Sequence, residues 1–133
     1  MKKVLIMAIV LLFGLAGCGN KGENEIVSIR IECAEICKSM GSPPFTEKTF
    51  KAINEIKAFQ RAIEKAEKMD GVLNYGVMFY MTVSYQDDTK QKYVLNVSDE
   101  EGSRGLLVDA ANSSQGYEIP EEQAEELARL IYA

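Results

Sequence analysis

The sequence has no histidine and no tryptophan among its 133 residues. Without an imidazole, the chain cannot form a Ser-His-Asp triad, a Cys-His dyad or a zinc site with histidine ligands. Basic residues are also few, since 15 Lys and Arg face 20 Asp and Glu. This excess of negative charge repels phosphate backbones and anionic lipid head groups. The composition therefore disfavours binding to nucleic acid and attachment to a membrane through a basic patch.

The sequence also lacks an apolar run long enough to span a membrane comfortably. Its longest run covers residues 4–15 at the amino terminus, whereas a span needs about 20 residues. Lys2 and Lys3 precede this run, and Leu15-Ala16-Gly17-Cys18 ends it. The basic start, the apolar stretch and the small residues before a cysteine resemble a bacterial lipoprotein signal peptide with its lipobox.

That resemblance implies that residues 1–17 are a signal peptide that is cleaved before Cys18. Cys18 would then carry a diacylglycerol on its sulfur, with acyl chains such as palmitate. Two acyl chains anchor a protein stably where one chain binds only marginally. Polar residues up to position 25 would form a flexible tether. We therefore expect a lipoprotein on the extracytoplasmic side of the cell membrane. The alternative, an uncleaved apolar anchor, suits the length of the run poorly.

Without Lys2 and Lys3, the mature chain has 13 basic and 20 acidic residues, a net charge of −7. Residues 26–133 are expected to form one domain. Alternating apolar residues predict strands at 26–33, 48–53, 75–85, 93–97 and 105–110, and residues 117–119 are a candidate for one more short strand outside the main order. Apolar spacings of three and four predict a helix capped by Asn54 and closed by Asp70-Gly71, and a second helix that starts at Pro120. The order β-β-α-β-β-β-α predicts an α+β fold, an antiparallel sheet with both helices packed on one face.

Several segments of this domain resemble the YhfM-like domain of small Bacillus-type lipoproteins. They are INEIKAFQRAIEKA at residues 53–66, the paired strands with Tyr93 and Leu95, the strand at Gly105-Leu106-Leu107, and the EELARLIY ending. The resemblance covers residues 45–132. It implies the fold of the domain and its location at the cell envelope, but no reaction. One position departs from it, because Asn96 stands just after Leu95 where the resemblance leads us to expect an aromatic residue.

Cys33 and Cys37 lie in the segment CAEIC. In a continuous strand their Cα atoms would be about 13 Å apart, and a disulfide needs less than about 7 Å. A disulfide therefore requires the chain to turn or coil between Ala34 and Ile36. Buried free thiols are a second possibility. A third is thiol redox chemistry, or a Cu(I) site in which Met40 adds a third sulfur ligand.

Met78, Tyr80 and Thr82 share the second face of the strand predicted at 75–85. With both helices on the other face, these residues form an interaction face unless other segments cover them. The acidic clusters at 87–88 and 99–101 lack the pattern of a calcium loop and read as solvated turns.

The leading hypothesis is a non-enzymatic, lipid-anchored binding or interaction module of the cell envelope. This hypothesis assigns the chain no catalytic residues, no cofactor and no metal. The chain would contact the membrane through Cys18 and would also bind a further ligand or an envelope protein. The alternative is a thiol redox or Cu(I)-handling protein that uses Cys33 and Cys37.

Overall fold

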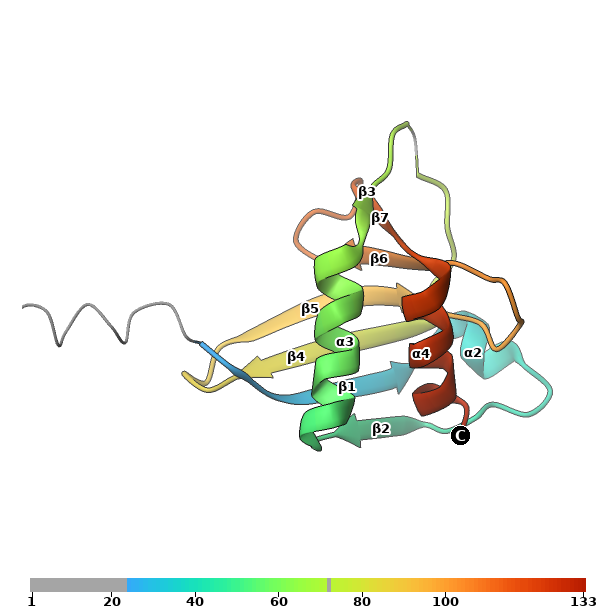
Figure 1. Cartoon of the computed structure of the whole chain (residues 1–133). Coiled ribbons are helices and arrows are strands. Elements are labelled where there is room, and N and C mark those ends of the chain that lie inside the picture. Colours follow the sequence, from blue (N-terminus) through green and yellow to red (C-terminus); the bar gives the residue numbers. More distant parts are fainter. Residues whose placement is uncertain (1–23, 72) are drawn as a thin grey trace, which may run out of the picture.

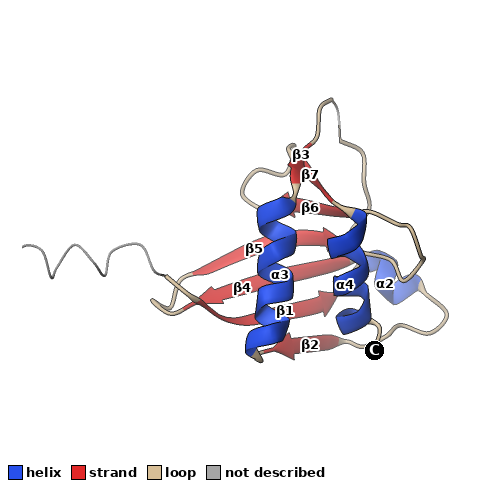
Figure 2. Cartoon of the chain, viewed as in Figure 1, coloured by secondary structure: helices blue, strands red, loops and turns tan. Residues whose placement is uncertain are grey.

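The computed structural model describes residues 24–71 and 73–133 (Figure 1). The predicted signal peptide, Cys18 and the tether up to residue 23 lie outside the described residues. Figure 2 shows the elements in colour: β1 (Ile26–Cys33), α2 (Glu35–Ser39), β2 (Glu47–Phe50), α3 (Ile53–Lys65), β3 (Glu67–Lys68), β4 (Phe79–Tyr85), β5 (Lys90–Asn96), β6 (Gly105–Asp109), β7 (Gly116–Ile119) and α4 (Glu121–Ile131).

The strands form one seven-stranded sheet in the order β2-β1-β4-β5-β6-β7-β3, and each neighbouring pair is antiparallel. Helices α3 and α4 lie side by side on one face of this sheet (Figure 1). The prediction of an α+β domain with two helices on one face is confirmed. No helix in residues 24–71 and 73–133 is long and apolar enough to cross a membrane.

The core lies between the two helices and the sheet face that they cover, here called the inner face. Strand alternation places Ile29 opposite Val83 and Ile31 opposite Met81 on this face, and all four side chains are buried. Phe59 of α3 is fully buried, and its ring centroid is 5.0 Å from that of Phe50. The apolar residues that recur every second position in the strands thus pack in one layer against those that recur every third or fourth position in the helices.

Helix α3 differs from the prediction at both ends. It begins at Ile53, and Ala52 rather than Asn54 occupies the N-cap position. The carboxylate of Glu55 accepts a hydrogen bond from the Ala52 backbone N–H at 3.3 Å, so the first turn starts two residues early. The helix ends at Lys65 because the following residues pair with β7 as β3. At the other helix, Pro120 is the N-cap residue of α4 and the first helical residue is Glu121.

Two short elements, α2 and β3, were not expected from the sequence, and β4 starts at Phe79 rather than at residue 75. The backbone before β4 bonds to the start of α2 instead: Ala34 N–H donates to the Met78 carbonyl at 2.8 Å and Ile36 N–H to the Val77 carbonyl at 3.0 Å. A helix of five residues is too short to reveal a period, and the pairing of β3 depends on a strand about 50 residues away.

Candidate ligand cleft, disulfide corner and outer face

The two ends of the strands form two distinct ends of the molecule. At one end, Ile26 of β1 lies opposite Tyr85 of β4, next to the predicted tether. At the other end, Cys33 of β1 lies opposite Phe79 of β4. We call these the tether end and the disulfide end. Helix α3 lies nearer the tether end and α4 nearer the disulfide end (Figure 1).

A cleft of about 260 Å³ opens between the carboxyl-terminal part of α3 and the inner face of the sheet. Ile63, Ala66 and Leu107 supply apolar lining. The remaining lining residues are polar or aromatic: Gln91, Tyr93, Asp109, Asn112, Gln115 and Tyr117. We call this the α3 cleft. Its lining combines an apolar wall with a small number of hydrogen-bonding groups, which is typical of small-molecule sites.

The carboxylate of Asp109 is held in place inside the α3 cleft. Its Oδ2 accepts a hydrogen bond from Gln91 Nε2 at 3.0 Å, and its Oδ1 accepts one from the Ala111 backbone N–H at 2.9 Å. The first bond joins the neighbouring strands β5 and β6, and the second lies within the turn that follows β6. The carboxylate therefore has a fixed orientation before any ligand arrives.

Gln115 fixes the opposite wall of the cleft. Its Nε2 donates to the Met69 carbonyl at 3.0 Å and to the Gly116 carbonyl at 2.9 Å. Like Gln91, it uses its amide nitrogen for bonds within the fold. Each of the two side chains also carries an amide oxygen, which is a hydrogen-bond acceptor.

Tyr93 is 8% exposed and forms part of the cleft wall. Burial, followed by the nearby Tyr85 and Asp109, raises the pKa of its phenol to about 12. The phenol therefore stays protonated well into the alkaline range.

A second hollow of about 720 Å³ continues along α3 towards the predicted tether. Asn24, Glu25 and Ile26 form one side of it, and Ile53 and other residues of α3 form the other. Ile63 lines both this hollow and the α3 cleft. The flank of α3 that faces the tether end is therefore open along most of its length.

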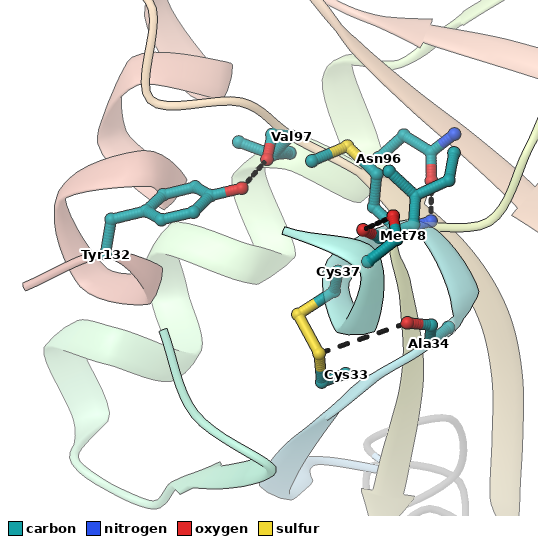
Figure 3. The surroundings of a disulfide bond; sticks show 9 residues. Cys33, Ala34, Cys37, Met78, Asn96, Val97 and Tyr132 are labelled. Atoms are coloured by element: carbon teal, nitrogen blue, oxygen red, sulfur yellow. Dashed lines mark hydrogen bonds between the residues drawn. A yellow bond between two sulfur atoms is a disulfide. The ribbon is translucent and has the colours of Figure 1, made fainter. Parts of the chain in front are cut away.

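The disulfide end is built differently. Cys33 and Cys37 form a disulfide with their Cα atoms 5.3 Å apart (Figure 3). Helix α2 supplies the coil that this alternative required and returns Cys37 over the end of β1. The two residues are 7% and 0% exposed. Met40 follows directly as the C-cap residue of α2, and its N–H donates to the Cys37 carbonyl at 3.2 Å.

The disulfide engages both sulfur atoms that the copper hypothesis needs as thiolates. In residues 24–71 and 73–133, no group of three or more His, Cys, Asp or Glu is placed to hold a metal ion. The arrangement favours a structural role for Cys33 and Cys37.

The interaction face predicted from Met78, Tyr80 and Thr82 lies on the sheet face opposite the helices, which we call the outer face. Tyr80 and Thr82 are half-buried there, and the ammonium of Lys92 is 4.3 Å from the centroid of the Tyr80 ring. Met78 precedes β4 and packs against the core. These residues therefore form a mixed polar and aromatic surface rather than one apolar patch. The role of this face in binding a protein partner stays a prediction.

Asn96 has a role that the sequence did not reveal. Its Oδ1 accepts a hydrogen bond from the Met78 N–H at 2.8 Å, and its Nδ2 donates to the Gly76 carbonyl at 2.7 Å. The side chain thereby fastens the segment before β4 to β5. Where the resemblance suggested an aromatic residue, this chain has an asparagine whose two hydrogen bonds join β5 to the segment before β4.

Sequence reasoning also missed the polar lining of the α3 cleft. Gln91 and Asp109 interrupt an otherwise apolar alternation at inner-face positions of their strands. Polar residues at such positions are an indication of a site, because a buried polar group needs partners. The sequence carried that indication, but not the pairing of β5 with β6 that brings the two residues together.

The comparisons with known proteins give one match. A family model described as "YhfM protein" matches residues 31–133. No curated protein and no solved structure matches the sequence.

Proposed function

The chain belongs to the YhfM protein family, and on that premise we propose that it is a lipid-anchored protein of the cell envelope that binds a ligand and catalyses no reaction. The α3 cleft is the observation that carries the binding function. It is preformed, partly apolar and lined by side chains whose hydrogen bonds already fix their positions.

The anchoring part of the proposal is supported by the amino-terminal sequence. A basic start, an apolar run and Leu15-Ala16-Gly17-Cys18 stand in the order of a lipoprotein signal peptide. Strand β1 begins at Ile26, eight residues after Cys18. An extended chain of that length spans at most about 30 Å. An anchor on Cys18 would therefore hold the tether end, and with it the open flank of α3, close to the membrane.

Binding is preferred over catalysis for two reasons. The sequence has no histidine to serve as a base near neutral pH. The carboxylate in the cleft, Asp109, already accepts hydrogen bonds on both oxygens from groups of the fold. A carboxylate held in this way is suited to recognising a positive charge or a hydrogen-bond donor.

Replacing Cys18 tests the anchor. We expect Cys18→Ser to abolish labelling by a fatty-acid analogue and to move the protein out of the membrane fraction, because anchoring depends on the acyl chains. The matched control is the double variant Cys33→Ser/Cys37→Ser, which keeps the lipobox and should remain labelled. Persistent labelling of Cys18→Ser would refute the lipoprotein assignment.

The second hypothesis, a thiol redox or Cu(I)-handling protein, has a direct test. Reduced protein can be titrated with Cu(I) in competition with a chromogenic chelator, beside the Cys33→Ser/Cys37→Ser variant. A structural disulfide predicts the same weak binding in both proteins. Tighter binding by the wild type that Met40→Leu weakens would favour copper handling instead.

A further inference from the structure

We propose that the α3 cleft recognises a small organic amine, with the protonated nitrogen seated beside the carboxylate of Asp109 and the rings of Tyr93 and Tyr117. This assignment rests on the proposed binding function and names the class of ligand. It follows from the charge, the hydrogen-bonding groups and the size of the cleft.

The charge of the cleft selects for a cation. Asp109 is the one acidic side chain among the described lining residues, and no Lys or Arg lines this part of the structure. The phenol of Tyr93 is neutral, as that of an ordinary tyrosine is at neutral pH. A ligand therefore meets a single negative charge in a partly buried setting, where a charge pair is screened less than in bulk water.

The hydrogen-bonding groups select for a donor. The amide nitrogens of Gln91 and Gln115 are engaged by Asp109 and by backbone carbonyls. The amide oxygens of these two residues and the carboxylate of Asp109 are acceptors that the lining residues carry. A primary ammonium group is the complement of such a lining, since it carries three donors and no acceptor.

The aromatic residues add to this preference. Tyr93 of β5 and Tyr117 of β7 lie on either side of β6, whose Leu107 pairs with Tyr117 in the sheet. Aromatic rings attract cations through their negative faces. A carboxylate and two tyrosines around one cleft is therefore a combination that suits an alkylammonium group better than an alcohol of the same shape.

The size and charge of the cleft narrow the ligand further. Its volume of about 260 Å³ lies below the roughly 300–1,000 Å³ of sites for drug-sized molecules. A ligand that also carried a carboxylate would place that group near Asp109 and be repelled. Simple aliphatic monoamines and diamines fit these limits best.

The test uses the full-length protein in detergent micelles and four probes of similar length: n-butylamine, 1,4-diaminobutane, 1-butanol and 4-aminobutanoate. Binding is followed by NMR at the Ala111 backbone amide and the Gln91 side-chain amide, which both bond to Asp109. We expect the two amines to shift these signals saturably, and 1-butanol and 4-aminobutanoate to bind at least about tenfold more weakly.

Asp109→Asn keeps the shape of the side chain and removes its charge. We expect it to weaken n-butylamine binding at least tenfold. The control is Asp87→Asn, which removes a carboxylate charge from the β4–β5 turn. Asp87 accepts a hydrogen bond from the Thr89 backbone N–H and does not line the cleft. This variant should bind n-butylamine as the wild type does. If Asp109→Asn does not fold, the comparison of n-butylamine with 1-butanol on the wild type still decides the assignment.

Three results would overturn the amine assignment. Equal shifts with 1-butanol would show a cleft that binds ligands without recognising an amine. Stronger shifts with 4-aminobutanoate would show that the cleft recognises the carboxylate of a ligand, and the proposed binding function would stand in both cases. No shift with any of the four probes would remove the amine assignment as well. Membrane anchoring is read separately, from the labelling of Cys18→Ser.

Discussion

The same strands end in two different ways at the two ends of the sheet. At the disulfide end, Phe79 is fully buried between the rings of Phe45 and Tyr132, with centroid distances of 5.7 and 6.1 Å. At the tether end, the corresponding inner-face positions carry Gln91 and Asp109, which line an open cleft. One end is closed by apolar and covalent contacts, and the other is left accessible.

The difference follows from how the helices cover the sheet. Helix α4 and the segment with α2 and the disulfide cover the disulfide end, whereas none of the other helices in residues 24–71 and 73–133 lies beside the flank of α3 towards the tether end (Figure 1). Large apolar residues on the inner face are favoured where helices cover them, because exposing them costs free energy. Polar residues at the uncovered end can bond to each other and to water. The inner-face sequences of β5 and β6 therefore become polar towards the tether end, at Gln91 and Asp109, whereas β1 and β4 keep the buried pair Ile29 and Val83.

The largest effect is expected at the closed end. Phe79→Ala removes a ring that is 0% exposed and leaves a cavity between Phe45 and Tyr132. We expect the free energy of unfolding to fall by about 3–5 kcal/mol. Urea denaturation measures the loss. Tyr85→Ala, in the same strand but half-buried at the tether end, is the matched control and should cost clearly less. Equal losses would mean that the tether end is packed as tightly as the disulfide end.

The disulfide should contribute less than this aromatic cluster. Cys33 and Cys37 are separated by 4 positions, and a loop this short restricts the unfolded chain by about 2 kcal/mol at most. We expect Cys33→Ala/Cys37→Ala to stay folded and to lose about that amount. Wild-type protein reduced with dithiothreitol should show a similar loss. A loss above about 4 kcal/mol in the variant would mean that the bridge also supports the packing around α2.

A single hydrogen bond at the closed end should contribute about 1 kcal/mol at neutral pH. The Tyr132 hydroxyl donates to the Val97 carbonyl at 2.6 Å (Figure 3), and Tyr132→Phe removes it. Burial, followed by Asp99, raises the pKa of Tyr132 from 10.0 to about 12. Folding therefore favours the neutral phenol, and its contribution is complete below pH 10 and is lost as the pH rises through 12.

The stability difference between wild type and Tyr132→Phe should accordingly narrow between pH 10 and pH 12. Urea denaturation of both proteins across this range measures the difference, and the contribution of Tyr93 cancels because both proteins keep it. A difference that is constant up to pH 12 would contradict the raised pKa of Tyr132.

The closed end was easier to predict from the sequence than the open end. Alternation in β1 and in the β4–β5 hairpin, and the apolar stripes of α3 and α4, depend on neighbours close in the sequence. The coil of α2 was expected only as a condition for a disulfide, since five residues show no period. The α3 cleft depends on which residues of β5 and β6 pair and on where α3 ends. Both are set by tertiary contacts, such as the pairing of Glu67 with Glu118 that ends the helix.

The smallest change in stability is expected from Gln91→Leu at the open end. Gln91 lies opposite Val83 in the sheet and donates to Asp109. In an open cleft, water can replace that donor, and the leucine gains apolar contact with Ile63 and Leu107. We expect the free energy of unfolding to change by less than about 0.5 kcal/mol, the range of substitutions that break no packed contact.

Ligand binding should respond differently to the same substitution. Leucine removes an acceptor oxygen from the cleft, so we expect n-butylamine to bind several-fold more weakly although the fold is unchanged. Denaturation and NMR titration of one sample give both values. A stability loss above about 1.5 kcal/mol would show that the Gln91–Asp109 bond is a buried structural contact. In that case Gln91 and Asp109 would be packed as tightly as the residues of the disulfide end. The tether end would then not be an open end of the sheet.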